Sequence, residues 1–484
     1  MPKHKRGATL LEAFIPIIFL VVSLFINVSI FGDSALDGSN QMILILSALI
    51  ASLMAVKLGY KWYEIREGIV KSISTAMSGI LILLLIGSLA GSWMISGIVP
   101  AMIYYGLQIV NPSIFLFASC LVCSIASLAT GSSWTTSATL GIALVGIGRA
   151  LDISEGMVAG AVLSGAYFGD KMSPLSDTTN LAPAMAGTDL FTHIRYMVYT
   201  TVPSIVLTLL IFLIIGFSSN NVGNMNATTD ILSSIDAAFY ISGWLFLVPI
   251  FMIFLIVKKV APIPALLAAA LLGIVFALIF QRDVIQEIAG YSGPYWKVMF
   301  VGSMKALYGS VVIITDNDMV NELLSSRGMA GMLNTVWLVI AAMTFGGVME
   351  CSGMLKSIAD SVIKRVKTTG SLIASTAGTC IFFNFTASDQ YLSIVVPGRM
   401  YSDIYKKMNL APENLSRTLE DSGTVTSVLV PWNTCGAFHA TVLSINPLDF
   451  IPYCFFNIIS PIMTITFGFL NLKIKKLVEG GSKF

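Results

Sequence analysis

The chain has 484 residues, of which 56% are hydrophobic and only 11% are charged, and its net charge at pH 7 is +2. A soluble domain typically carries about 25% charged residues, so this composition excludes an ordinary soluble fold and predicts an all-α polytopic protein embedded in a lipid bilayer. The nearly neutral chain also predicts no nucleic-acid partner, because binding to phosphates depends on an excess of Lys and Arg.

Apolar segments of about 20 residues predict membrane-spanning helices. In the first half they predict spans at residues 10–31, 41–58, 76–95 and 194–217. The charged stretch 60–75 predicts an interfacial helix. Residues 98–110, which include Pro100, are also placed at the interface.

Residues 114–148 have two apolar arms around a polar centre, Thr130–Thr136, and each arm is expected to be too short to span comfortably. This pattern predicts a re-entrant hairpin, since irregular backbone at membrane depth is tolerated only where protein or a water-filled cavity surrounds it.

The stretch Gly165–Asn180 lies in the next segment, 155–187, and places Asp170, Lys171 and Asp177 close to a proline. Charge at bilayer depth is expensive and must be paired or wetted. We therefore expect a helix that is broken at membrane depth and lines a binding site.

The second half begins after a polar linker, 218–236, that contains no Lys or Arg. Its apolar segments predict spans at residues 237–257, 262–280, 331–351 and 450–472. Residues 281–330 are mixed and are interpreted as peripheral, although 298–314 is apolar enough to leave a crossing open. A second hairpin is predicted at 371–397 and a second broken helix at 417–444.

The two halves repeat the same order of elements. A Ser-Gly pair precedes each hairpin tip by 33 residues, Thr130 and Pro174 are 44 residues apart, and Thr386 and Pro431 are 45 apart. Such matched interruptions indicate an internal duplication and are the best sequence pointer to a transporter site.

Charge placement then predicts the topology. Ten crossings, five per half, make the second repeat inverted and place the basic segments and both termini in the cytoplasm. The predicted organisation is a first repeat at 1–217, an extracellular linker at 218–236, a second repeat at 237–472 and a cytoplasmic tail at 473–484. In this arrangement the two hairpin tips meet near the midplane.

The four interrupted segments are rich in oxygen ligands, which hard cations such as Na⁺ prefer. The predicted ion- or substrate-binding residues are Thr130, Ser132, Ser133, Ser173, Thr178, Asn180, Asn384, Thr386, Ser388, Thr424, Thr426, Asn433 and Thr434. Na⁺ is placed at Asp177 and Asp389 with neighbouring hydroxyls, and no cofactor is expected besides the transported ions.

A carboxylate that binds either a proton or a cation, but not easily both, gives exchange through alternating access. Asp389 and Asp177 are the first choices for this exchange, and Asp170 and Asp421 the second. Two other interpretations stay open. In one, Asp170-Lys171 and Glu420-Asp421 lie in water at helix ends. In the other, Asp177 only caps the helix that follows.

The motifs Gly131-Ser-Ser-Trp, Gly165–Asn180, Asp389-Gln-Tyr-Leu-Ser, Leu415–Thr424 and Pro431-Trp-Asn-Thr-Cys-Gly together resemble the NhaC family of bacterial Na⁺/H⁺ antiporters. The resemblance covers about residues 10–472. It implies a bacterial plasma membrane, cation/proton exchange, an elevator-type fold and a homodimer. The same family includes exchangers of organic acids such as malate and lactate.

The predicted function is therefore Na⁺/H⁺ antiport rather than enzymatic catalysis. The alternative is a Na⁺/H⁺-coupled exchanger of a small carboxylate or amino acid, and Lys171, beside Asp170, favours neither. A channel is disfavoured because two inverted site-bearing halves differ from a symmetric pore. A hydrolase is disfavoured because no His or Cys stands at useful spacing to a Ser.

Overall fold

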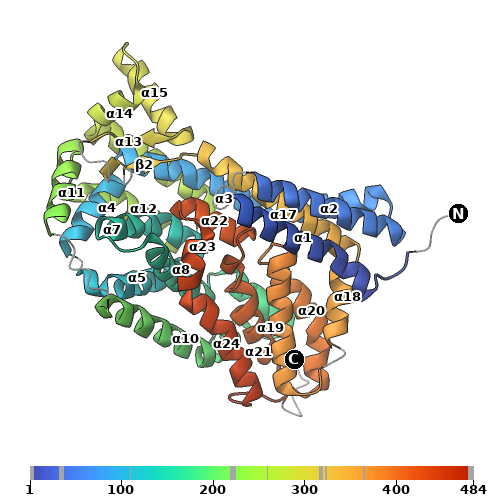
Figure 1. Ribbon diagram of the computed structural model, residues 1–484. Coiled ribbons are helices and arrows are strands. Elements are labelled where there is room, and N and C mark those ends of the chain that lie inside the picture. Colours follow the sequence, from blue (N-terminus) through green and yellow to red (C-terminus); the bar gives the residue numbers. More distant parts are fainter. Residues whose placement is uncertain are drawn as a thin grey trace.

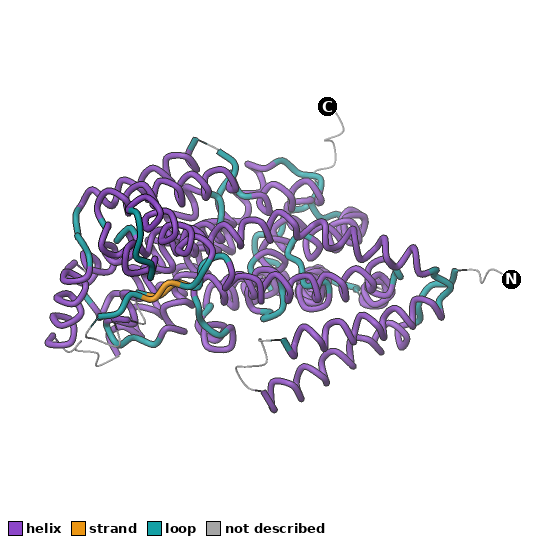
Figure 2. Tube along the Cα trace, turned by 90° about the horizontal axis from the view of Figure 1, so that it is seen from above, coloured by secondary structure: helices purple, strands orange, loops and turns teal. Residues whose placement is uncertain are grey.

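The computed structural model describes residues 5–31, 38–109, 111–218, 225–258, 260–315, 320–321, 324–363 and 366–477. Within these residues the chain is almost entirely helical, and two short strands, β1 (Val311–Val312) and β2 (Ser325–Ser326), pair antiparallel. Figure 2 shows this small sheet at one side of the helical body. Parts of the predicted linker, 219–224, and of the predicted tail, 478–484, lie outside the described residues.

The first half is built in the order shown in Figure 1. Its elements are α1 (Leu10–Phe31), α2 (Ser39–Lys57), α3 (Trp62–Ile95), α4 (Ile98–Ile109), η2 (Pro112–Ile114), α5 (Phe115–Thr130), α6 (Ser133–Thr136), the π-helix η3 (Ser137–Gly141), α7 (Ile142–Ala150), α8 (Glu155–Met172), α9 (Asp177–Ala186) and α10 (Leu190–Ser218).

The second half follows, also as helices. Its elements are α11 (Met225–Ala238), η4 (Gly243–Phe246), α12 (Leu247–Val257), α13 (Pro262–Phe280), α14 (Arg282–Ala289), α15 (Tyr295–Tyr308), η5 (Ala330–Met332), α17 (Leu333–Cys351), α18 (Met354–Ile363), α19 (Thr369–Thr386), α20 (Leu392–Lys407), α21 (Pro412–Leu419), the π-helix η6 (Glu420–Thr424), η7 (Ser427–Leu429), α22 (Thr434–Leu443), α23 (Pro447–Phe450), η8 (Ile451–Tyr453) and α24 (Phe455–Phe469).

Seven helices of the described chain are long and apolar enough to cross a membrane, and two bent helix pairs raise this to nine if each pair is one span. The seven are α1, α2, α3, Pro112–Thr130, α10, α13 and Ala330–Cys351. The multi-pass prediction is thereby confirmed. The predicted ten crossings also count the two broken helices, and that number stays a prediction.

The sequence predicts two separate elements where the structure has the single helix α3. The interfacial stretch and the span form one continuous helix of 34 residues, about 51 Å at 1.5 Å per residue. Nothing in the sequence between them breaks a helix, and Glu64 accepts a 2.9 Å hydrogen bond from the Lys61 N–H at its start. Because this length exceeds the hydrocarbon core of about 30 Å, the charged first turns extend beyond it.

The predicted straight span 237–257 is wrong. The chain bends by 85° between Thr229–Ala238 and Gly243–Leu255, which leaves α12 with 11 residues. Two polar side chains explain the bend. Ser242 caps η4, and the Gln281 side chain both accepts from the Tyr240 N–H at 3.1 Å and donates to its carbonyl at 2.9 Å.

The segment 298–314 forms no helix of spanning length. Its helix, α15, has 14 residues and ends at Gly309, so it reaches only about 21 Å. Figure 1 shows α14 and α15 projecting from the body of the molecule. The peripheral interpretation of residues 281–330 stays a prediction.

Antiparallel helical segments lie at both predicted hairpins, with longer arms than expected, while their re-entry into the membrane stays a prediction. In the first, α5 enters and α6, η3 and α7 return, so that Gly148 lies beside the Phe115 ring at the open end. Its first arm with η2 is long enough to span, contrary to the prediction. In the second, α20 runs antiparallel to α19, and the Tyr401 hydroxyl lies 2.9 Å from that of Thr379.

The broken helices flank these tips. Helix α8 ends at Met172, and α9 begins at Asp177, after a break of four residues. The second begins earlier than predicted, at Pro412, and continues through η6 and η7 before α22 starts at Thr434. Between α9 and α10, Asp189 accepts hydrogen bonds from Thr192 that hold the pKa of Asp189 below its usual value.

Matching local structure recurs at the predicted repeat. Helices α3 and α17 end with Ser96 and Ser352 in nearly identical conformations, followed by Gly97 (φ +78°) and Gly353 (φ +73°). These two helices also pack against each other. The recurrence supports duplication, while the inverted orientation of the halves stays a prediction.

Helix α8 packs closely along α5 through small residues. A Cβ atom added at Gly165 would lie 2.1 Å from the Cys120 carbonyl oxygen, and one at Gly169 would lie 2.5 Å from the Leu128 nitrogen. Ser127 reaches across to donate a 2.6 Å hydrogen bond to the Ala166 carbonyl. Small residues at such contacts let two backbones approach in a membrane, and here they hold the broken helix against the hairpin.

We therefore expect Gly165→Ala to lower stability by about 1–3 kcal/mol through overpacking. The matched control is Gly378→Ala on α19, where an added Cβ meets nothing within 4 Å and the better helix propensity of Ala should leave stability equal or slightly raised. Thermal unfolding of both variants in detergent, followed by size-exclusion chromatography, measures the difference. Equal melting temperatures would contradict the close packing of α5 and α8.

Candidate functional site

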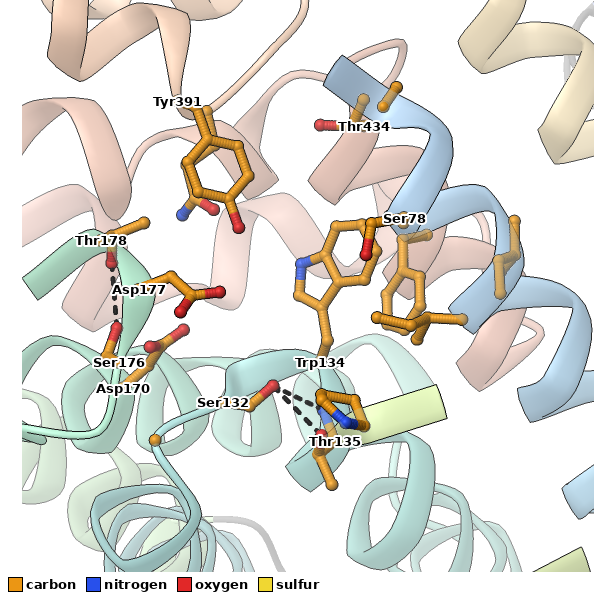
Figure 3. A pocket seen from close by; sticks show the side chains of 18 of the residues that line it. Ser78, Ser132, Trp134, Thr135, Asp170, Ser176, Asp177, Thr178, Tyr391 and Thr434 are labelled. Carbon is orange, nitrogen blue, oxygen red and sulfur yellow. Dashed lines mark hydrogen bonds between the residues drawn. The ribbon is translucent and has the colours of Figure 1, made fainter. Parts of the chain in front are cut away.

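A cavity of about 800 Å³ lies where the two hairpin tips and the first broken helix converge. Residues of α3, α12, α13, α17 and α22 complete its wall. Figure 3 shows its polar side chains turned toward a common space, with Trp134 and Tyr391 on opposite sides of it.

The structure brings seven predicted residues to this cavity. They are Thr130, Ser132, Asp170, Asp177, Thr178, Asp389 and Thr434. Three of the four predicted exchange acids are therefore in one place, and they come from both halves of the chain.

Asp170 stands in the last turn of α8 and is only 7% exposed. Its carboxylate accepts a 2.6 Å hydrogen bond from the Ser133 hydroxyl and a 3.1 Å bond from the Ser133 N–H. These bonds tie the first hairpin tip to the first broken helix. A cation bound at Asp170 would thus interact with a carboxylate that contacts both the first hairpin tip and α8.

Asp177 is the first residue of α9, and its side chain is exposed to the cavity. The prediction that Asp177 might only cap this helix does not hold, because Ser176 is the N-cap and its side chain accepts from the Thr179 N–H. The Asp177 carboxylate makes no hydrogen bond recorded in the described part of the chain. It is therefore available to a ligand, at the positive end of a helix dipole.

Asp389 lies in the second hairpin tip and is 2% exposed. Its Oδ1 accepts a 2.9 Å hydrogen bond from the Leu392 N–H, which starts α20. The preceding residue, Ser388, has φ +58°, an uncommon conformation for a residue other than glycine. The Thr434 N–H donates to the Ser388 carbonyl at 3.0 Å, so the tip is held in this turn by the start of α22.

Several predicted ligands hold the site together rather than line the cavity. Asn384 donates to the Gly423 carbonyl at 2.7 Å and to the Thr426 hydroxyl at 3.0 Å, and Asn433 donates to the Asn384 carbonyl at 2.9 Å. These bonds fasten the second tip to the second broken helix. The predicted residues outside the cavity lining are Ser133, Ser173, Asn180, Asn384, Thr386, Ser388, Thr424, Thr426 and Asn433.

Asp421 is the predicted exchange acid that the structure places elsewhere. It forms an ion pair with Lys171 and accepts a 2.8 Å hydrogen bond from Thr200, and it does not line the cavity. The alternative that these charges lie in water at helix ends is also wrong, because Lys171 and Asp421 are 0% exposed and Asp170 only 7%. Asp421 therefore already has an internal counter-ion.

Trp134, the last residue of the Gly131-Ser-Ser-Trp motif and not among the predicted binding residues, lines the cavity and stacks on Phe438 with ring centroids 4.0 Å apart. Ser176, Gln390 and Tyr391 also contribute to the lining. Ser176 lies in the motif Gly165–Asn180, and Gln390 and Tyr391 lie in Asp389-Gln-Tyr-Leu-Ser. These motifs indicated the region of the site but not which of their side chains line the cavity.

His439 on α22 lies outside the cavity lining. Its two ring nitrogens contact the hydroxyls of Ser137 at 2.9 Å and Tyr167 at 3.2 Å. The imidazole therefore links the first hairpin and α8 to α22, which is a positioning contact between the two halves.

The charge of the cavity is one-sided. Three carboxylates face it, and the described residues that line it include no Lys, Arg or His. Carboxylate, hydroxyl and carbonyl oxygens are ligands for hard cations. This arrangement suits a cation or a proton and would repel a free carboxylate.

Comparison with known proteins agrees with this chemistry. The Na⁺/H⁺ antiporter family matches residues 165–472, which contain the second part of the first half and all of the second. The chain belongs to this family. The NhaC resemblance is thereby confirmed, and the matched range includes Asp170, Asp177 and Asp389.

Three relatives resemble it over nearly their whole length. The Na⁺/H⁺ antiporter NhaC of Alkalihalophilus pseudofirmus is 36% identical over 98% of this chain and 97% of its own. The malate-2H⁺/Na⁺-lactate antiporter of Bacillus subtilis is 34% identical over 96% of both chains. The arginine/ornithine antiporter ArcD of Halobacterium salinarum is 34% identical over 96% of this chain and 92% of its own.

Proposed function

We propose that this chain exchanges Na⁺ for protons across a bacterial plasma membrane. The observation that carries the proposal is the convergence of Asp170, Asp177 and Asp389 on one cavity whose described lining has no basic side chain. Membership of the Na⁺/H⁺ antiporter family supports the same activity.

The exchange follows from competition for the carboxylates. An ionised carboxylate is stabilised by a bound cation, and the same carboxylate out of water is stabilised by a proton. Because Na⁺ and the proton bind the same carboxylate oxygens, the site carries one or the other each time it crosses between the two membrane faces. Asp389 and Asp177 are the proposed primary exchange residues, and Asp170 joins them as a third ligand.

Alternating access is proposed to move the site between the two membrane faces. The repeated end of α3 and α17, the two hairpins and the two broken helices support a pair of related halves. We propose that these halves are inverted repeats of an elevator-type transporter that forms a homodimer with both termini in the cytoplasm.

The organic-acid alternative fits the cavity less well. A malate- or lactate-like substrate needs a positive partner, and Lys171, which follows Asp170 in the chain, is paired with Asp421 instead. An amino-acid substrate would have to present its ammonium or guanidinium group to the three carboxylates. Neither substrate is needed for the exchange proposed above.

Transport by the purified protein in proteoliposomes tests the proposal. An imposed Na⁺ gradient should move protons across the vesicle membrane with no organic acid or amino acid present, as a trapped pH dye would report. Empty vesicles provide the control. If protons move only after malate, lactate or an amino acid is added, simple antiport is refuted and the alternative remains.

A further inference from the structure

A second group of buried charges lies outside the cavity, around the π-helical turn η6. Glu420, Asp421 and Lys171 are each 0% exposed. Turns of π-helix are rare and appear often at functional sites, because the extra residue displaces the normal hydrogen-bond ladder. The charges in this turn therefore need an explanation of their own.

Lys171 and Asp421 satisfy one another. The Lys171 ammonium pairs with Asp421 and donates a 3.1 Å hydrogen bond to Ser460, while Asp421 also accepts from Thr200 and Ser460. The pair is neutral as a whole and has polar partners on both sides. It needs no transported ion to balance it.

Glu420 is in a different situation. Among the described residues, no hydrogen bond of ordinary geometry reaches either carboxyl oxygen of Glu420 or the Ser422 hydroxyl of the same turn. Only the Thr424 hydroxyl, also in this turn, interacts with the Glu420 side chain among them, and no ion pair balances the buried acid. Burying an ionised carboxylate without a partner costs far more than burying a neutral carboxyl. The buried surroundings of Glu420 therefore favour a carboxyl group that carries its proton.

The charged groups that interact electrostatically with Glu420 are Lys171 and Asp170 on α8 and Asp421 on its own turn. His193 on α10 contacts the Ser416 hydroxyl through Nδ1 at 2.8 Å. Lys171 is thus within electrostatic reach of both acids of η6, and only Asp421 is paired with it in this state.

We propose that Glu420 is a second proton-binding site of the transport cycle, separate from the cavity acids that bind Na⁺. The inference rests on the proposed Na⁺/H⁺ exchange. In this step the carboxyl group of Glu420 releases H⁺ to water, and the carboxylate left behind takes Lys171 as a shared counter-ion. Reprotonation from the other side of the membrane restores the state described here.

Asp170 connects this site to the cavity. Asp170 lies on the face of α8 that lines the cavity, while the next residue, Lys171, pairs with Asp421 of η6. A negative charge on Asp170 disfavours a second negative charge on Glu420, because like charges repel. Na⁺ bound at Asp170 cancels that repulsion and so promotes release of the Glu420 proton, which couples the two sites.

The test is the number of protons exchanged per Na⁺ by wild type and Glu420→Gln in proteoliposomes. Glutamine has the shape of the protonated acid but cannot release a proton. At a clamped membrane potential, the Na⁺ gradient at which proton flow reverses gives the ratio. We expect the ratio of Glu420→Gln to be one proton lower than that of wild type, with Na⁺-driven exchange retained.

Glu413→Gln is the matched control, because Glu413 is a buried acid of the preceding helix α21 that pairs with Lys475 instead. Its ratio should equal that of wild type. An unchanged ratio in Glu420→Gln overturns the second proton site alone. Failure of wild type to couple Na⁺ to protons would instead overturn the proposed function.

A second measurement on wild type decides the question if Glu420→Gln does not fold. Dicyclohexylcarbodiimide reacts with protonated carboxyl groups in apolar surroundings, and mass spectrometry locates the modified peptide. Labelling of Glu420 should be strong at low pH and fall as pH rises. Labelling that does not change with pH, or no labelling at any pH, would show that Glu420 does not exchange its proton.

Discussion

Asp177→Asn and Asp389→Asn are each expected to lower Na⁺-driven proton exchange by about 100-fold or more, equivalent to about 2.8 kcal/mol at about 1.4 kcal/mol per tenfold change. Asparagine keeps the shape of the side chain but removes the charge that holds the cation and the oxygen that takes the proton. Asp177 has no competing hydrogen bond recorded in the described chain, and Asp389 accepts one from the Leu392 N–H. Initial rates of dye quenching in proteoliposomes measure the loss.

The matched control for this prediction is Asp403→Asn. Asp403 lies on α20, the helix that follows Asp389, but its side chain is 82% exposed and its nearest basic partner, Lys406, is 3.9 Å away. This variant should exchange ions at the wild-type rate. Wild-type Na⁺ affinity and turnover in both Asp177→Asn and Asp389→Asn would refute the assignment of the site, provided that both proteins elute as folded species.

The position of these acids was partly predictable from the sequence. Charged and hydroxyl residues beside Pro174 and in the hairpin tips stand out in an apolar chain, and a membrane interior tolerates them only around a site. The same reasoning predicted α13 at 262–280 and the two tips at their observed places. Local composition was enough because the bilayer imposes length and polarity on each segment.

The partners of individual side chains were not predictable in the same way. Successive residues of a helix point about 100° apart, so Asp170 faces the cavity while Lys171 faces η6. Lys171 and Asp421 are 250 residues apart in the chain, and no local pattern links them. The sequence therefore predicted four acids near a site without showing that one of them already had a partner.

Hydropathy also gives no information on side chains that bond to the backbone and so interrupt a helix. The 237–257 segment is apolar throughout, yet Ser242 and the distant Gln281 stabilise an 85° bend in it. Conversely, charges at 61–71 suggested a separate interfacial helix, although no glycine pair or proline ends the helix before Ile95. A hydropathy window senses average polarity, whereas helix continuity depends on the backbone hydrogen bonds.

Lys171→Met is expected to destabilise the protein by about 3–5 kcal/mol, because it leaves Asp421 as an unpaired charge in the interior. Thermal unfolding in detergent measures this loss. Lys406→Met, which removes the lysine of the exposed pair with Asp403 on α20, is the control and should leave stability nearly unchanged, since exposed pairs contribute little.

The double variant Lys171→Met/Asp421→Asn tests the cause of that loss. Removing both charges eliminates the unpaired acid, so most of the stability lost in Lys171→Met should return. If the double variant is no more stable than Lys171→Met, the ion pair is not what the lysine contributes. If instead stability returns but Na⁺-driven exchange does not, the pair is required for transport beyond its part in folding, as expected when Lys171 also serves as counter-ion to Glu420.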